Sequence, residues 1–161
     1  MANAGNAGAA GANPAPGTPP DISQMSPRER FLRLQDRVER AAESGDSATA
    51  RQFAPMAIAA YGMLDSFDVD VRFHAGIMHT ELGQFPEAAA LADTIEAADR
   101  GNLLGEILRM EIARARRDST ALARNRRAFL AAYDRQIARA RPEYQEHQAM
   151  LEDYHRRLAG P

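Results

Sequence analysis

Residues 69–102 read VDVRFHAGIMHTELGQFPEAAALADTIEAADRGN, and this stretch decides the fold. Apolar and small residues recur at helical spacing as far as Gly83, a residue type that commonly ends a helix. Pro86 then stands where the first turn of a new helix favours proline. The stretch therefore predicts two helices, near 69–82 and 86–99, joined by a tight turn.

The chain before this stretch predicts a second pair of helices. Ser26-Pro27-Arg28-Glu29 combines an N-cap serine, a proline at the first helical position and a glutamate three residues after the cap. Apolar residues then follow one face until Gly45, which is expected to end the helix. Asp46 can cap the next helix, in which Pro55 is expected to cause a kink or to loosen the first turns.

The chain after residue 102 predicts a third pair, with its turn at Asp118-Ser119-Thr120. Pro142 interrupts the pattern, and a last helix is expected from Glu143 to Leu158. No stretch alternates between apolar and polar residues, so no strand is expected. The predicted fold class is all-α, with three helical hairpins and a C-terminal helix that caps them.

The three predicted hairpins recur at a nearly constant distance along the chain. Gly45, Gly83 and Asp118 mark their turns, with separations of 38 and 35 residues. A period in this range is typical of helical solenoids, in which stacked hairpins bury a continuous core together. The alternative is a generic bundle of antiparallel helices.

The middle hairpin, residues 69–102, resembles the tetratricopeptide repeat, a helix–turn–helix unit of 34 residues. The resemblance rests on the spacing of four residues: Gly76, Gly83, Phe85 and Ala88. The sequence departs from the family's preferred residues at four others: Arg72, His79, Ala92 and Arg100. The two outer hairpins resemble the family mainly in their spacing along the chain.

The resemblance implies a concave groove, lined by the first helix of each pair, that holds a segment of a protein partner. From the middle hairpin the groove residues would be Asp70, Phe73, His74, Ile77, Thr80 and Glu81. From the first hairpin they would be Asp36, Glu39 and Glu43. Such a groove would be acidic with apolar contact points, and the function would be non-enzymatic binding or assembly.

Charge is distributed unevenly along the chain. Residues 1–108 carry a net charge of −7 and residues 109–161 carry +5, which sum to −2. The basic end would comprise Arg114, Arg116, Arg117, Arg124, Arg126 and Arg127. Acidic and basic ends would favour head-to-tail oligomers or filaments as the alternative function. Two interpretations of these arginines remain. The simpler is a solvated face of a monomer, and the more specific is a phosphate-binding patch.

Residues 1–25 form an arm or linker rich in Ala, Gly and Pro, ahead of a helical domain over 26–161. The arm has almost no large apolar residue with which to offset its ordering entropy. If it follows a removed signal or anchor, an exported or cell-envelope location is favoured over the cytoplasm. The other hypothesis is that the arm docks on a neighbouring copy and extends an assembly.

Several function classes are not indicated. The chain has no cysteine, which excludes thiolate metal sites and cysteine nucleophiles. No phosphate-loop or dinucleotide motif occurs, and the net charge does not indicate nucleic-acid binding. Glu152 and His155 form the only Glu-x-x-His pair, whereas di-iron bundles need two. The expectation is therefore no enzyme activity, no cofactor, no metal site and no membrane span.

Overall fold

The computed structural model describes residues 24–160, so nearly all of the predicted arm, 1–25, lies outside the described residues. This part of the chain is all-helical and contains no strand. The helices are α1 (Pro27–Glu43), α2 (Ser47–Tyr61), α3 (Val69–Glu81), α4 (Phe85–Ala98), α5 (Leu103–Ala115), α6 (Ser119–Ile137), α7 (Pro142–Glu146) and α8 (Gln148–Ala159). No helix within 24–160 combines the length and the apolar character that a membrane crossing requires.

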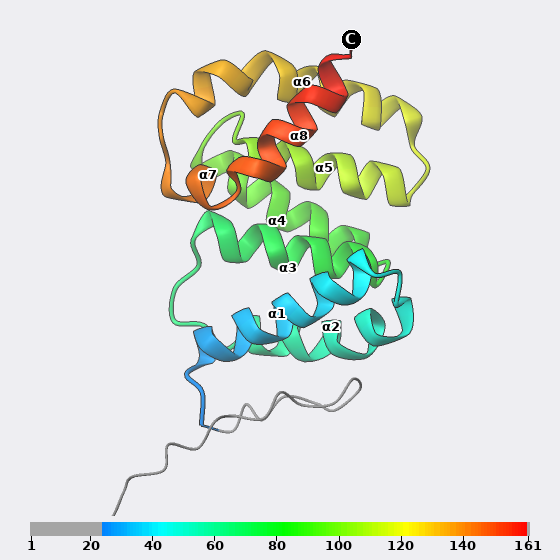
Figure 1. Ribbon diagram of the computed structural model, residues 1–161, viewed down its shortest axis with the longest axis vertical. Coiled ribbons are helices and arrows are strands. Elements are labelled where there is room, and N and C mark those ends of the chain that lie inside the picture. The colour runs from blue at the N-terminus through cyan, green and yellow to red at the C-terminus, as the bar shows by residue number, and fades with distance from the viewer. Residues whose placement is uncertain (1–23, 161) are drawn as a thin grey trace, which may run out of the picture.

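The first six helices pack as three consecutive pairs. Helix α1 packs on α2, α3 on α4, and α5 on α6, and adjacent pairs meet through α2 with α3 and α4 with α5. Helices α3 and α5 also touch directly, and α8 packs against α6. Figure 1 shows the first pair at one end, the third at the other and the middle pair between them.

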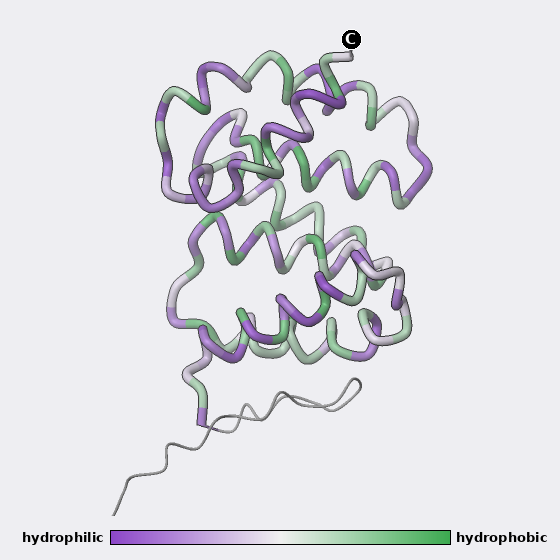
Figure 2. Tube along the Cα trace, in the orientation of Figure 1, coloured by the Kyte–Doolittle hydropathy of each residue, from purple (hydrophilic) through white to green (hydrophobic). Residues whose placement is uncertain are grey.

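The core consists of two apolar clusters. One joins α1 and α2 and reaches α3 through Val71 and Met78. The other joins α3 to α6 and includes Tyr144 and Leu151 from the C-terminal segment. Figure 2 shows α2 and α4 as mostly apolar, whereas α1 and α8 alternate between polar and apolar residues. That alternation suits helices with one face on the core and the other in solvent.

The three turns within the pairs share one geometry. Gly45 and Gly83 have φ of +76° and +72°, and Arg117 occupies the same place in the third turn with φ of +57°. In each turn the next amide donates to the carbonyl five residues before it at 2.8 Å, as in a Schellman motif. The equivalent of Gly83 is therefore Arg117 rather than Asp118, which caps α6. The turn residues Gly45, Gly83 and Arg117 are therefore separated by 38 and 34 residues.

One prediction about helix continuity was wrong, and one of the two alternatives expected at Pro55 is excluded. Helix α2 runs unbroken from its Asp46 cap through Pro55, whose ring lies on the exposed face, so its first turns are not loosened. The predicted last helix, in contrast, is broken at His147, which has φ −104° and ψ 17°. The His147 ring contacts Asp70 of α3, a tertiary interaction that no local pattern reveals.

The predicted acidic end is also wrong. The first pair, residues 27–61, holds six arginines and five acidic residues. The acidic excess lies in residues 65–106, with nine acidic residues and two arginines, and this is the middle of the molecule. Four of its nine carboxylates pair with arginines of the third hairpin and beyond, for example Asp93 with Arg109 at 2.9 Å. Acidic and basic segments therefore neutralise each other inside one chain.

Candidate functional site

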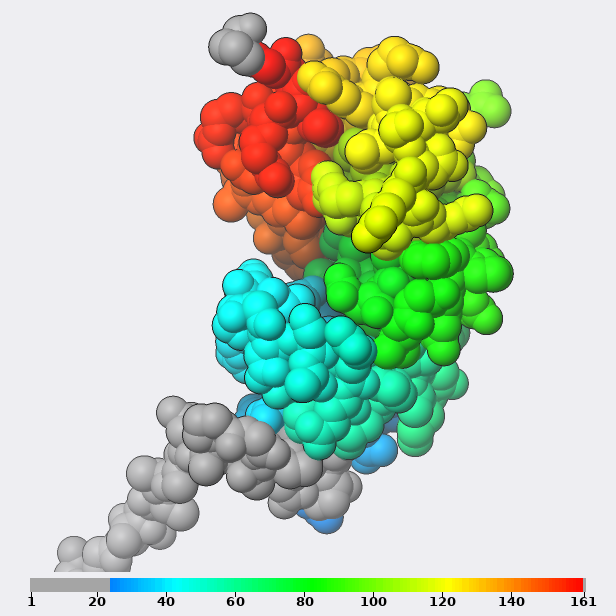
Figure 3. Space-filling view, turned by 90° about the vertical axis from the view of Figure 1, so that its right-hand side faces the viewer, coloured from blue at the N-terminus to red at the C-terminus, as the bar shows by residue number. Residues whose placement is uncertain are grey.

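A groove of about 1170 Å³ runs across the molecule between the first hairpin and the C-terminal helix. Helices α1, α3, α5 and α8 all contribute to its lining. Figure 3 shows it from the side, as the notch between the cyan end of the first hairpin and the orange C-terminal segment. Its volume is above the range of about 300–1,000 Å³ that is usual for small-molecule pockets.

Most of the predicted groove residues line this space. They are Glu39, Glu43, Phe73, His74, Ile77, Thr80 and Glu81. Asp70 is not among the lining residues but contacts His74 and His147, which are. Asp36 lies elsewhere: it is exposed and pairs with Arg40 one turn along α1. The α1 face that meets the groove instead carries Glu39, Ala42 and Glu43.

Sequence reasoning missed the lining residues of α5 and α8. Those of α5 are Ile107, Glu111, Arg114 and Ala115, and each stands 34 residues after an α3 residue that lines the groove: Phe73, Ile77, Thr80 and Glu81. The repeat period therefore contained the signal for α5. Helix α8 and the turn before it add His147, Met150, Tyr154 and Arg157, for which the period gives no signal.

The wall formed by α8 is fastened to α5 by polar contacts. The Tyr154 hydroxyl donates to Glu111, which also pairs with Arg114. Burial and the hydrogen bond to Glu111 raise the pKa of Tyr154 to about 12. The Arg157 guanidinium lies 4.8 Å from the centroid of the same ring, within cation–π range. These contacts fix one side of the groove.

One end of the groove holds a cluster of histidine and carboxylate side chains. His74 is buried on α3, and its Nε2 lies 3.2 Å from Asp70 Oδ1, one turn before it. His147 Nε2 lies 2.7 Å from the same oxygen. His74 Nδ1 lies 2.6 Å from Glu39 Oε1 of α1, although the carboxylate is off the line of the N–H bond. Three separate parts of the chain therefore meet here.

The cluster shifts the ionisation of its members. Burial alone would lower the pKa of His74, but the contacts with Asp70 and Glu39 outweigh burial and raise the pKa to about 9. Burial would likewise raise the pKa of Asp70, but His147 and His74 hold it well below its usual range. His74 and Asp70 therefore form an ion pair at neutral pH.

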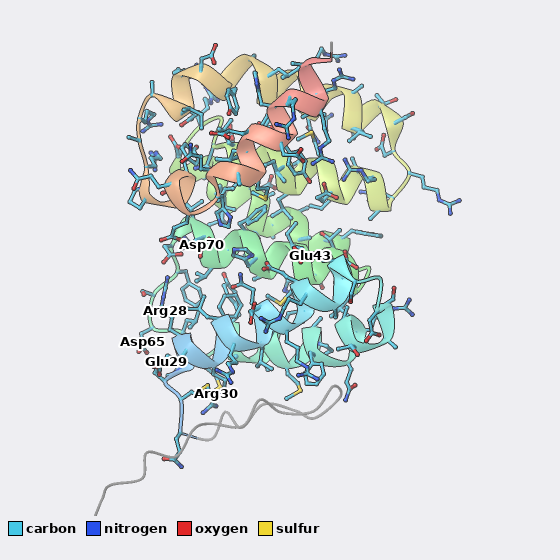
Figure 4. All side chains as sticks on the ribbon, viewed as in Figure 1. Arg28, Glu29, Arg30, Glu43, Asp65 and Asp70 are labelled. Carbon is cyan, nitrogen blue, oxygen red and sulfur yellow. The ribbon has the colours of Figure 1, made fainter. Side chains whose placement is uncertain are left out.

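Charged side chains flank the apolar surface of the groove. Its apolar contact points include Phe73, Ile77 and Met150, which come from α3 and α8. Glu43 and Glu81 are exposed at the rim, and neither forms an ion pair within residues 24–160. Figure 4 labels Asp70 at the start of α3 and Glu43 at the end of α1, at opposite ends of the groove.

The arginines of the predicted basic end do not all line one hollow. All six of its arginines are exposed, and Arg114 belongs to the groove described above. Arg116 and Arg124 lie around a hollow of about 240 Å³ together with Asp93 and Asp118. Because carboxylates share this hollow, its charge is mixed, which favours the solvated-face interpretation over a phosphate site.

The chain was compared with protein-family models, with curated proteins and with solved structures, and none of them matches it.

Proposed function

We propose that this chain is a non-enzymatic protein-interaction module whose groove binds a segment of a partner protein. The observation that carries the proposal is the groove of about 1170 Å³, lined by residues of five helices and edged by charges. Its apolar contact points give a peptide places to bury side chains, and its polar rim gives orientation. Its size suits a helical or extended peptide better than a small metabolite.

We also propose that the fold is a tetratricopeptide-like solenoid of three hairpins with a C-terminal capping helix. Three features support this: the pairwise packing, the shared turn geometry at Gly45, Gly83 and Arg117, and the 34-residue offset between groove residues of α3 and α5. Gly76 lies where α3 meets α5, since a Cβ there would be 2.4 Å from Leu108 Cδ2. Gly76 therefore allows close packing between successive hairpins.

The chemistry of the rim defines the partner segment. Glu43 and Glu81 lie at the end of the groove where α1 and α3 finish, while Arg114 and Arg157 belong to the opposite wall. A segment with apolar residues at helical spacing and basic residues at one end would complement this arrangement. Glu43 and Glu81, which have no ion-pair partner within residues 24–160, would attract the basic end of the segment and so set its direction.

The test uses a defined set of fluorescent peptides with apolar residues at i, i+3 and i+7. The peptides carry arginines at one end, at the other end, or at neither. We expect binding by fluorescence anisotropy for one of the arginine-bearing orientations. Reversal of both rim charges, E43K with E81K, should weaken that binding by about tenfold, because a change of about 1.4 kcal/mol corresponds to a factor of ten.

A matched control is D65K, which reverses an exposed charge in the loop between α2 and α3, away from the groove. Equal loss of binding in the control would contradict the role of the rim, and no binding by any peptide would contradict the proposal. Size measurement across a salt series tests self-assembly. A salt-sensitive ladder of sizes would favour the oligomer over the partner-binding module.

A further inference from the structure

The cluster at the end of the groove combines side chains that can also bind a metal ion. The ligand atoms of Asp70, His74 and His147 lie within 4.8 Å of one another, and the Nε2 atoms of both imidazoles contact the same Asp70 oxygen. We propose that Asp70, His74 and His147 bind one divalent transition-metal ion, with Zn²⁺ as the best match. This inference is independent of whether the groove binds a peptide.

The geometry is close to that of a metal site. Ligand atoms about 2.1 Å from a tetrahedral ion lie about 3.4 Å from one another. His74 Nε2 and Asp70 Oδ1 are 3.2 Å apart, and His147 Nε2 and Asp70 Oδ1 are 2.7 Å apart. The His147 ring therefore has to move away from Asp70 Oδ1 for an ion to enter. Asp70 and His74 stand four residues apart on α3, a spacing that places both on one helix face.

A supporting carboxylate orients the buried histidine. Glu39 lies 2.6 Å from His74 Nδ1, on the opposite side of the ring from the proposed ion. Histidine ligands usually donate a hydrogen bond from the second ring nitrogen to such a group. Glu39 would take this role once its carboxylate lies on the line of the Nδ1–H bond. Gln35, which is buried in α1, donates to the same Glu39 carboxylate at 3.3 Å. Glu39 is therefore a positioning residue rather than a ligand.

The backbone also presents His147 to the cluster. The C-terminal segment leaves helical geometry at this residue, with φ −104°, and resumes as α8 directly after it. The Phe73 ring packs edge-on against both imidazoles, with ring centroids 5.1 Å from His74 and 5.7 Å from His147. Both rings are thus held in place by the surrounding fold.

The identity of the metal follows from the donor set. Imidazole nitrogen with one carboxylate oxygen suits Zn²⁺ and similar first-row ions rather than Ca²⁺ or Mg²⁺, which prefer oxygen. Three protein ligands leave a fourth position, and His74 and His147 both line the groove. The fourth position therefore faces the groove, where water or a ligand group can complete the coordination.

The test uses the full chain without an affinity tag, after treatment with EDTA and dialysis. We expect isothermal titration calorimetry with ZnCl₂ to give one equivalent of bound metal. H147Q should lower the affinity by at least about a hundredfold, and E39Q by about tenfold to a hundredfold, as second-shell changes typically do. Co²⁺ titration should give ligand-field bands of a mixed nitrogen and oxygen site, which H147Q should abolish.

The chain supplies its own matched control, because two of its four histidines lie outside the cluster. His79 contacts Gln84, and His155 stacks on Tyr133. The double variant H79Q/H155Q should keep one equivalent at unchanged affinity. Binding that survives H147Q, that disappears in H79Q/H155Q, or that is absent from the unmodified chain would overturn the proposal. Circular dichroism verifies that each variant is folded. If H147Q does not fold, the loss of affinity in E39Q tests the proposal instead.

Discussion

Substitution of Gly76 by alanine tests the helix crossing on which the arrangement of the groove depends. An ideal Cβ at this position would lie 2.4 Å from Cδ2 and 3.0 Å from Cδ1 of Leu108, a fully buried residue of α5. Forcing an extra methyl group into such a contact costs about 1–3 kcal/mol. Alanine returns up to about 1 kcal/mol of helix propensity. We expect G76A to destabilise the fold by about 1–2 kcal/mol.

Urea denaturation followed by circular dichroism measures this change, and the melting temperature should fall by roughly 2–8 °C for a chain of this size. G62A is the matched control, since Gly62 has helical φ and its Cβ would meet only carbonyl oxygens at 3.5 Å or more. In an L108A background the clash is removed, so G76A should become neutral or stabilising. Equal destabilisation by G76A in both backgrounds, or no difference from G62A, would refute the reasoning.

Three further predictions concern the turns, a buried phenol and the core. R117G should stabilise the fold by about 0.5–1 kcal/mol in urea denaturation, because φ of +57° is unfavourable for a residue with a Cβ. R116G, at a position with φ −80°, should give no gain in stability. Equal effects of the two substitutions would contradict this prediction. Burial raises the pKa of Tyr144 to about 12, while the phenol of the unfolded chain ionises near pH 10. The neutral, buried phenol therefore contributes its full stabilisation below pH 10, and this stabilisation is lost as the pH rises towards 12. Y144F should reduce this loss of stability at alkaline pH. It should also cost about 1–3 kcal/mol at neutral pH, since the hydroxyl accepts from the Leu103 amide and donates to Gln136. A pH–stability profile identical to that of the unmodified chain would count against this prediction. A88L should overpack the buried side of α4 by about 1–3 kcal/mol, whereas A90L on its exposed side should leave the melting temperature unchanged; the opposite ranking would exclude the assigned face.

Local signals were sufficient for most of the helices. The capping box at Ser26 and the aspartate caps at Asp46 and Asp118 are present as predicted, because each depends on a hydrogen bond within three residues of sequence. The all-helical class also follows from periodicity. The nine groove residues came from the resemblance to the tetratricopeptide repeat, and seven of them line the groove. Reading the 34-residue period one hairpin further would have added the groove residues of α5.

The tertiary structure alone decided how the C-terminal segment lies. A helical pattern predicts an unbroken helix from Glu143 to Leu158, but the contact between His147 and Asp70, 77 residues apart, accompanies a break at His147. The same contact completes the histidine cluster, whose members come from α1, α3 and the turn before α8. Sequence spacing specifies neighbours on one helix face, whereas a site built from three elements depends on how those elements dock. That docking is set by long-range packing and charge pairing, which no single stretch of sequence encodes.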